Sequence, residues 1–390
     1  MANFYEILGI GPKADLEEVR GAYRRLAREF HPDVNPDPRA HEQMATINVA
    51  FEVLSDPARR AEYDASIGQA GIREREDKQD DESRPNFVQA QILRRLREHA
   101  TPVYSAAFEP ETNRLVTCSF DNEVVWWNKS AEFPEKRVKL EGGVAGSMRL
   151  IGKDRFVAAG GSEQLVTGWQ YDNGRINSWR HKTSGWVCSV APSADGESVA
   201  FGRTDNELQV LRAQDGYVRF RGLTHRDAVT ALAWNQDSSW LASGSADATV
   251  KIWCGATGNR VERLDQIRSQ VSAIAFSPDN QWLAVAAVDL SIRVFNLNDM
   301  SLKKTFFGHE RPIEVLAFHP KNWLLASGSR DGTIQMWNVR QGLGHGKIEA
   351  SHQPISSLTF APDGRHMVAG GLDKVLRVWR LSMAQNVSSS

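Results

Sequence analysis

Hydrophobic residues recur at one fixed interval over residues 87–382. Seven large apolar residues stand 42 positions apart: Trp127, Trp169, Leu211, Trp253, Phe295, Trp337 and Trp379. An acidic residue precedes each of them by six positions: Asp121, Glu163, Asp205, Asp247, Asp289, Asp331 and Asp373. Two columns that keep the same phase through seven copies predict seven repeats of one structural unit.

The pattern inside each unit is that of short β-strands. Residues 229–234, 240–243 and 249–253 are runs rich in β-branched and aromatic residues, and turn residues separate them. A single unit would leave a hydrophobic sheet face and its edges exposed, whereas seven units arranged radially bury both. We therefore predict an all-β, seven-bladed propeller over residues 87–382, followed by a polar tail at residues 383–390.

The ends of the repeat region predict how the ring closes. The seventh unit stops after its third strand, residues 375–379, while residues 91–96 align with the fourth strand of a later unit, residues 216–221. An extra strand at the start and a missing strand at the end indicate that the two pair with each other. The propeller is therefore expected to be closed by its N-terminal strand.

Residues 1–66 follow a different, helical pattern. Apolar residues recur at helical spacing in residues 19–30 and again in residues 47–54, and a loop with three prolines in seven residues separates the two stretches. This predicts a small all-α domain built on a helical hairpin with an exposed loop. Residues 73–82 are almost entirely charged, so residues 67–86 are predicted to form a flexible, solvated linker, with an exposed helix as the alternative.

Composition and charge narrow the class of protein. The net charge of −1, from 47 basic and 48 acidic residues, argues against a general nucleic-acid binder. Three widely spaced cysteines exclude a disulfide framework and a paired-cysteine zinc site, and they fit a reducing cytoplasm. No apolar run approaches the roughly 18 residues that a membrane-spanning helix needs, and the first residues lack a secretory signal. A cytoplasmic protein without cofactor or metal is expected.

The repeats resemble those of the WD-repeat family, whose units of roughly 40–45 residues form four-stranded blades. Gly308-His309 matches the opening dipeptide of that family, while its closing Trp-Asp pair is degenerate here and reads Trp337-Asn338 or Trp253-Cys254. In WD-repeat proteins a histidine, a hydroxyl, an acid and a tryptophan form a buried hydrogen-bond network. The resemblance implies three such networks: His99, Thr117, Asp121 and Trp127; His225, Ser243, Asp247 and Trp253; His309, Ser327, Asp331 and Trp337.

The same residue types also suggest a Ser-His-Asp hydrolase triad. A catalytic site would not recur three times around a ring, whereas a network that stabilises each blade would, so no catalytic residue is assigned. The other four units carry Ala159, Phe201, Val285 or Ala369 in place of the hydroxyl. Those four blades are expected to depend on apolar packing.

The helical region resembles the J domain of DnaJ-type co-chaperones. The resemblance rests on four segments in order: Tyr5-Glu6-Ile7-Leu8-Gly9, Ala22-Tyr23-Arg24-Arg25-Leu26-Ala27, the signature His31-Pro32-Asp33, and Ala58-Arg59-Arg60-Ala61-Glu62-Tyr63-Asp64. It implies docking on the ATPase of a DnaK-type (seventy-kilodalton heat-shock) chaperone and acceleration of its ATP hydrolysis. The implied binding residues are the triplet His31, Pro32 and Asp33, with an electrostatic face of Arg20, Arg24, Arg25 and Arg28.

The alternative for these arginines is an ordinary solvated helix face. The chain has no GxxxxGK[ST] motif, so it is not expected to hydrolyse ATP itself. The Gly/Phe-rich stretch and the CxxCxGxG zinc region of many DnaJ proteins are also missing from the sequence. The propeller takes their place, which favours recognition of a specific folded client.

Three functions therefore compete. The first is a J-domain co-chaperone whose propeller recruits a specific protein client or complex, without nucleic-acid or membrane partners. The second is a WD-repeat interaction scaffold with a non-stimulating J domain. The third is a propeller enzyme. The sequence has neither the clustered metal ligands nor the paired-carboxylate motif, outside the repeated positions, that would support this function.

The repeat phase also predicts a partner-binding face at the mouth of the ring. It would contain large apolar groups and two charges, which binding hot spots favour. The predicted residues are Trp186, Tyr104, Phe120, Val288, Glu314, Arg330 and Leu372. For each aromatic ring the alternative is packing between blades as core.

Overall fold

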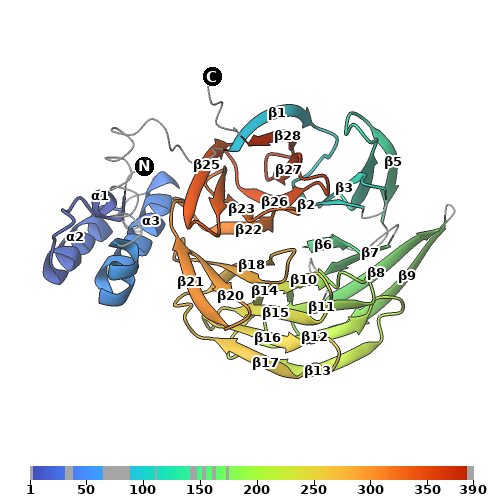
Figure 1. Cartoon of the computed structure of the whole chain (residues 1–390), viewed down its shortest axis with the longest axis horizontal. Helices are drawn as coiled ribbons and strands as arrows, with labels where there is room; N and C mark the ends of the chain where they lie inside the picture. Colours follow the sequence, from blue (N-terminus) through green and yellow to red (C-terminus); the bar gives the residue numbers. More distant parts are fainter. Residues whose placement is uncertain are drawn as a thin grey trace, which may run out of the picture.

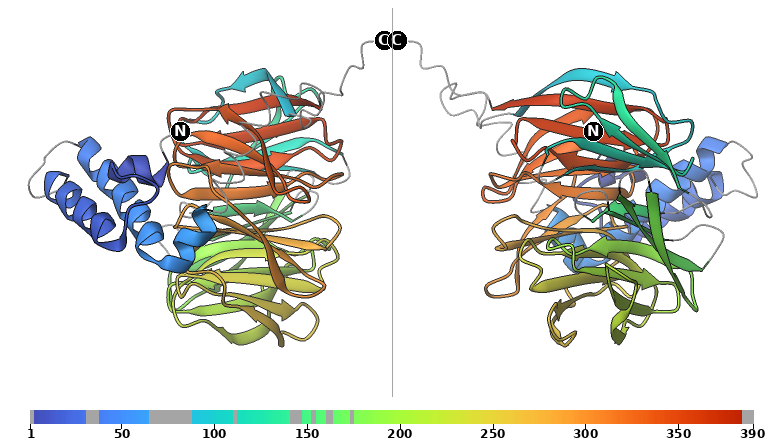
Figure 2. Two further views of the ribbon diagram at one scale, coloured as in Figure 1. Left: turned by 60° about the vertical axis from the view of Figure 1, so that its left-hand side comes forward. Right: turned by 90° about the vertical axis from the view of Figure 1, so that its right-hand side faces the viewer.

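The computed structural model describes residues 3–30, 38–64, 88–109, 112–140, 147–151, 155–159, 164–172 and 175–383. They form a small helical domain and an all-β propeller that lie side by side (Figures 1 and 2). The predicted triplet His31, Pro32 and Asp33, the side chain of Arg28 and the predicted linker at residues 67–86 lie outside the described residues.

The helical domain contains α1 (Phe4–Leu8), α2 (Leu16–Glu29) and α3 (Pro38–Ser55), and a further helix runs through residues 57–64. α1 and α2 each begin with a capping box, in which the cap side chain accepts the amide of a glutamate three residues on and the glutamate accepts the cap amide. These pairs are Asn3 with Glu6 and Asp15 with Glu18. Gly9 ends α1 in the left-handed conformation, with φ 65°.

The propeller strands of the described residues form seven four-stranded sheets. In chain order the first three are β2 (Val103–Phe108), β3 (Leu115–Ser119), β4 (Glu123–Trp127) and β5 (Pro134–Lys139); β6 (Ser147–Leu150), β7 (Arg155–Ala159), β8 (Leu165–Asp172) and β9 (Arg175–Lys182); β10 (Val187–Pro192), β11 (Ser198–Arg203), β12 (Glu207–Arg212) and β13 (Val218–Thr224). The next three are β14 (Val229–Trp234), β15 (Trp240–Ser245), β16 (Val250–Cys254) and β17 (Arg260–Leu264); β18 (Val271–Phe276), β19 (Trp282–Ala287), β20 (Ile292–Asn296) and β21 (Ser301–Phe306); β22 (Ile313–Phe318), β23 (Leu324–Ser329), β24 (Thr333–Asn338) and β25 (Leu343–Glu349).

The remaining sheet joins the two ends of the repeat region. It contains β1 (Val88–Leu96), β28 (Leu376–Met383), β27 (His366–Gly371) and β26 (Ile355–Phe360), in that order. β1 runs antiparallel to β28, with Val88 opposite Met383 and Leu96 opposite Leu376. Figure 1 shows β1, in cyan, beside β28, in red. The ring is thus closed by hydrogen bonds between its first and last strands.

Apolar contact between neighbouring sheets forms the core. The first residue of five innermost strands is fully buried: Val103, Val229, Val271, Ile313 and Ile355. Gly244 of β15 allows one such contact, because a Cβ there would lie 2.4 Å from the Cγ1 atom of Val271 in the next sheet. Glycine at this position therefore sets the distance between two adjacent sheets.

Candidate functional site

The first candidate surface is the basic face of α2. Arg20, Arg24 and Arg25 are exposed, while Val19 and Ala22 on the opposite face are buried in the core of the helical domain. The side chain of Arg24 donates from Nε to the carbonyl oxygen of Arg20 at 3.3 Å. Three of the four predicted arginines thus lie on the solvent-exposed side of α2, and we call this set the arginine stripe.

The second candidate is the set of histidine networks in the propeller. In all three, a hydroxyl lies between an imidazole and an indole: the distances from histidine Nε2 to the hydroxyl are 2.8, 2.8 and 2.7 Å for His99, His225 and His309. The distances from tryptophan Nε1 to the same hydroxyls are 3.0, 2.8 and 2.9 Å. An aspartate lies 3.3, 3.2 and 2.9 Å from histidine Nδ1.

The direction of these hydrogen bonds follows from the donors available. The indole N–H can only donate, so the hydroxyl of Ser243 accepts from Trp253; when Nε2 of His225 is unprotonated, the hydroxyl gives its own proton to that nitrogen. Nδ1 then carries the remaining proton and donates it to Asp247. In this arrangement the imidazole is neutral, with its proton on Nδ1.

The electrostatics agree with a structural role. Burial lowers the pKa of His225 to about 4 and also lowers the pKa of His99. Burial alone would raise the pKa of Asp247, but the backbone amide of Arg226 and the hydroxyl of Thr249 hold it below its usual value. The imidazole therefore stays neutral at physiological pH, and the serine hydroxyl is occupied on both sides rather than free to attack a substrate.

In three of the other four sheets the residues that replace the hydroxyl, Phe201, Val285 and Ala369, are buried in apolar clusters, but each of these sheets also contains a charged pair that the sequence analysis did not predict. Where the hydroxyl is missing, an arginine pairs with the recurring acid. Arg293 contacts Asp289 at 3.0 Å with both side chains 1% exposed, and Arg377 contacts Asp373 at 2.5 Å. In the third sheet Arg203 contacts Asp205 at 2.8 Å. The fourth acid, Glu163, lies outside the described residues.

The sequence contains the signal for two of these pairs. Arg293 and Arg377 each stand four residues after the recurring acid, where the networks with histidine have other residues. Burial alone would raise the pKa of Asp289, and the Arg293 guanidinium holds it below its usual range. Acid and arginine together keep a charged pair inside the blade in place of the histidine network.

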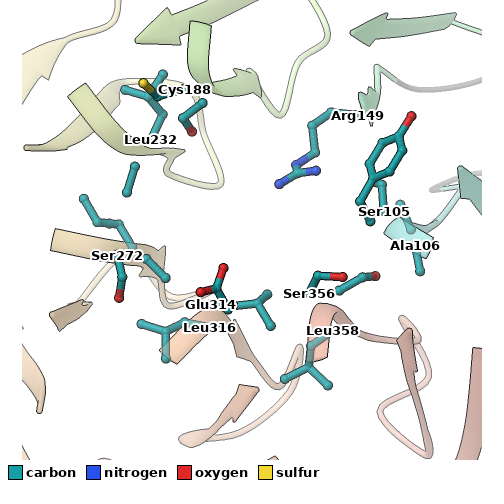
Figure 3. A pocket seen from close by; sticks show the side chains of 18 of the residues that line it. Ser105, Ala106, Arg149, Cys188, Leu232, Ser272, Glu314, Leu316, Ser356 and Leu358 are labelled. Atoms are coloured by element: carbon teal, nitrogen blue, oxygen red, sulfur yellow. The ribbon is translucent and has the colours of Figure 1, made fainter. Parts of the chain in front are cut away.

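The third candidate is a cavity of about 540 Å³ at the centre of the ring. Tyr104, Phe120, Glu314 and Leu372 of the predicted partner face line it, whereas Trp186, Val288 and Arg330 are not among its lining residues. Figure 3 shows the side chains of Arg149 and Glu314 reaching into the cavity from different sheets, with Ser105, Ser272 and Ser356 around them.

The predicted face divides into buried and exposed residues. Tyr104 is buried, with its ring centroid 4.6 Å from that of Phe120, so this pair packs as the wall of the cavity. Val288 is half-buried, and Glu314 is paired with the exposed Arg330. Trp186 and Leu372 are each 47% exposed. Only these two supply open apolar surface among the predicted residues.

Several buried hydroxyls of the cavity have no partner within the part of the chain that the structure describes. They are Tyr104 Oη, Ser272 Oγ and Ser357 Oγ. Burial also raises the pKa of Tyr104, which keeps its phenol protonated and able to donate. Unpartnered buried polar groups cost free energy, so the cavity wall offers hydrogen bonds that a ligand or water can take.

Sequence reasoning missed Arg149. In the phase of the repeats it stands where the other six units have small residues: Ala107, Ala191, Ala233, Ala275, Ala317 and Thr359. A comparison of the aligned columns for single outliers would have found it. Arg149 brings a positive charge to a cavity whose other charged lining residue among those described is Glu314.

The described ranges hold neither a candidate metal site nor a candidate membrane-spanning helix. They contain no group of three or more histidine, cysteine, aspartate or glutamate side chains placed to hold a metal ion. None of the helices in these ranges combines the length and the apolar character needed to span a bilayer.

Comparison with known families gives three matches along the chain. The family model of the DnaJ domain matches residues 3–64, and that of the WD domain, G-beta repeat, matches residues 90–128. The model described as IFT122 first beta-propeller matches residues 193–390.

Curated relatives match over a short part of the chain. Proteins named "Chaperone protein DnaJ" are 59% identical over 70 residues in Thermosynechococcus vestitus, 58% over 70 residues in Trichormus variabilis and 56% over 62 residues in Dictyoglomus thermophilum. These matches cover 18%, 18% and 16% of this chain and the same shares of the three relatives. The chain thus spans less than a fifth of the length of the curated relatives it matches.

Proposed function

Because the chain belongs to the family of the IFT122 first beta-propeller and carries a DnaJ domain at residues 3–64, we propose that it is a J-domain co-chaperone with a propeller that recruits its client. It would stimulate ATP hydrolysis by a DnaK-type chaperone. The observation that carries this proposal is the exposed stripe of Arg20, Arg24 and Arg25 on α2, next to the His31-Pro32-Asp33 sequence in a DnaJ domain.

The proposed mechanism has two parts. The α2 arginines attract an acidic surface of the chaperone and orient the encounter. His31 and Asp33, with Pro32 fixing the backbone between them, make contacts that favour the ATP-hydrolysing conformation of the chaperone. The chain itself does no chemistry on the nucleotide in this scheme.

The domain organisation belongs to the same proposal. We take residues 1–66 as the J domain, 67–86 as a linker, 87–382 as the propeller and 383–390 as a tail. Each four-stranded sheet of the propeller is taken as one blade, which gives seven. The client would bind at the mouth of the ring, where Trp186 and Leu372 are exposed. The cavity there is lined by the charged side chains of Arg149 and Glu314 and by buried hydroxyls that have no partner among the described residues.

Replacement of His31 tests the co-chaperone mechanism. His31→Gln is expected to abolish stimulation of the chaperone ATPase and to leave the melting temperature of the full chain unchanged. Single-turnover ATP hydrolysis by a DnaK-type chaperone measures the effect. Lys13→Gln, at an exposed position before α2, is the matched control and should stimulate like the wild type.

The outcomes separate the two leading functions. Equal stimulation by wild type and His31→Gln would contradict the mechanism. No stimulation by the wild type would instead favour the WD-repeat scaffold with a non-stimulating J domain. Because the arginine stripe acts through charge, stimulation should also fall as the salt concentration rises above the physiological range.

Replacement of Trp186 tests the client surface. Trp186→Ala is expected to weaken client binding by about 1–2 kcal/mol, or roughly 5- to 30-fold. The melting temperature should change little because the side chain is 47% exposed. The measurement is a binding titration with a client captured by the full chain, and Trp323→Ala, at an exposed tryptophan outside the predicted face, is the control. Unchanged affinity, or a large loss of stability, would place the client surface elsewhere.

A further inference from the structure

The J domain contacts one particular sheet of the propeller, β18–β21, through apolar side chains. Leu290, in the turn between β19 and β20, and Phe307, directly after β21, pack with the hydrophobic core of the J domain. The ring of Phe307 lies 5.4 Å from that of Tyr63 and 6.3 Å from that of Phe4. Leu290 is only 2% exposed, although it occupies a surface turn.

Polar contacts surround this apolar centre, and their charges are complementary. Asp56 accepts from Arg268 at 3.3 Å, and the side chain of Arg59 donates to the carbonyl oxygen of Arg268. The Glu62 carboxylate accepts from the hydroxyl of Thr305 at 3.2 Å, and it lies 3.8 Å from the guanidinium of Arg293. In both ion pairs the J domain supplies the carboxylate and the propeller supplies the arginine.

The repeat phase gives independent support, because Leu290 is an outlier in its column and only one of the six positions equivalent to Phe307, Leu223, holds a large apolar residue. The six positions equivalent to Leu290 hold no large apolar residue: Asn122, Gln164, Asn206, Ala248, Gly332 and Lys374. The positions equivalent to Phe307 hold Arg97, Lys139, His181, Leu223, Asp265 and Glu349. Leu290 also adopts φ 64°, a conformation that a leucine rarely takes. An exposed large apolar residue in a strained turn is unfavourable unless something covers it.

We propose that the sheet β18–β21 is a built-in dock that holds the J domain and the propeller as one body. Leu290 and Phe307 are its apolar anchors, and Asp56–Arg268 and Glu62–Arg293 fix its orientation. The dock uses α1 and residues 56–63, while α2 lies on the side of the J domain that faces away from the propeller (Figures 1 and 2). The docked arrangement therefore leaves the arginine stripe accessible, a consequence that rests on the proposed function.

The test replaces both anchors with residues that the equivalent positions already carry. Leu290→Asn introduces the residue found at the equivalent positions 122 and 206, where Asn122 and Asn206 have φ 63° and 72°. Phe307→Lys introduces the residue found at the equivalent position of Lys139. The matched control makes the same exchanges one repeat earlier, as Ala248→Asn with Asp265→Lys, in the sheet β14–β17. Ala248 has φ 60°, so asparagine suits it as well. Both variants should keep the melting temperature of the propeller.

Nuclear magnetic relaxation of J-domain amides in the full chain measures docking. In the wild type and the control these amides should relax at the rate of the whole 43.5 kDa chain. In the anchor variant their transverse relaxation rates should fall several-fold, because the freed domain tumbles independently. Fast independent tumbling of the J domain in the wild type would overturn the proposal, as would equal rates in the wild type and a folded anchor variant. Phe307→Lys alone is the second variant, should the double exchange fail to fold.

A separate measurement addresses the orientation of α2. ATPase stimulation by the anchor variant should stay within two-fold of the wild type, because α2 is accessible in both. If the anchor variant stimulated the ATPase many-fold more than the wild type, the dock would hide α2. That result would overturn the proposal that the arginine stripe is accessible in the docked arrangement. The relaxation measurement needs no chaperone, so failure of the dock is distinguishable from failure of the co-chaperone mechanism.

Discussion

Removal of residues 1–98 is expected to lower the melting temperature of the propeller by at least about 10 °C, or to prevent its folding. This deletion takes away β1 and leaves β28 as an unpaired sheet edge. It also removes Leu96, which is buried against the core of the neighbouring sheet. Thermal unfolding followed by circular dichroism measures the effect.

Removal of residues 1–84 is the control, because it spares β1. This shorter deletion uncovers Leu290 and Phe307, so it is best made together with Leu290→Asn and Phe307→Lys. We expect a propeller that melts close to the temperature of the full chain. Similar melting temperatures for the two truncations would mean that β1 contributes little to the closed ring.

Ser243→Ala is expected to lower the free energy of unfolding by about 2–6 kcal/mol. The substitution leaves two buried groups without a partner, Nε2 of His225 and Nε1 of Trp253, and each unsatisfied buried group costs about 1–3 kcal/mol. Denaturant unfolding of the full chain gives the value. The size of the effect would show that the histidine networks are a main source of blade stability.

Ser243→Thr is the matched control, because Thr117 occupies the equivalent position and bonds His99 and Trp127 in the same way. It should retain most of the stability of the wild type. An alanine variant as stable as the threonine variant would argue against the network as a stabilising element.

Periodicity predicted the regular parts of the fold with good accuracy. The run at residues 229–234 coincides with β14, and residues 91–96 fall within β1, which pairs with β28. Such strands are predictable because alternation and turn residues are local signals, and because seven copies repeat the same signal. The resemblance to WD-repeat proteins likewise implied a network of His225, Ser243 and Asp247, and the structure joins these side chains by hydrogen bonds.

What the sequence did not predict are the departures from the repeat. Arg149 and Leu290 each break a column; Arg149 lies in a cavity lined by several sheets, and Leu290 packs against the other domain. The phase of the repeats also predicts where a residue lies around the ring, but it does not predict how exposed that residue is. Tyr104 was predicted to lie at the mouth of the ring, and the structure shows it buried in the wall of the cavity. A pattern read along one chain reports local preference, and pairing between distant outliers needs the three-dimensional structure.

Closure of the ring by β1 and β28 sets an order of events during synthesis. Leu96 leaves the ribosome 280 residues ahead of its opposite residue, Leu376. At roughly 5–20 residues per second, β1 waits on the order of 15–60 s for its pairing strand. The J domain precedes the whole propeller in the chain, so it can fold during that interval beside its own unfinished ring. Nascent or prematurely terminated chains that end before residue 376 keep two unpaired edges, and these are the forms of the protein most exposed to aggregation and proteolysis.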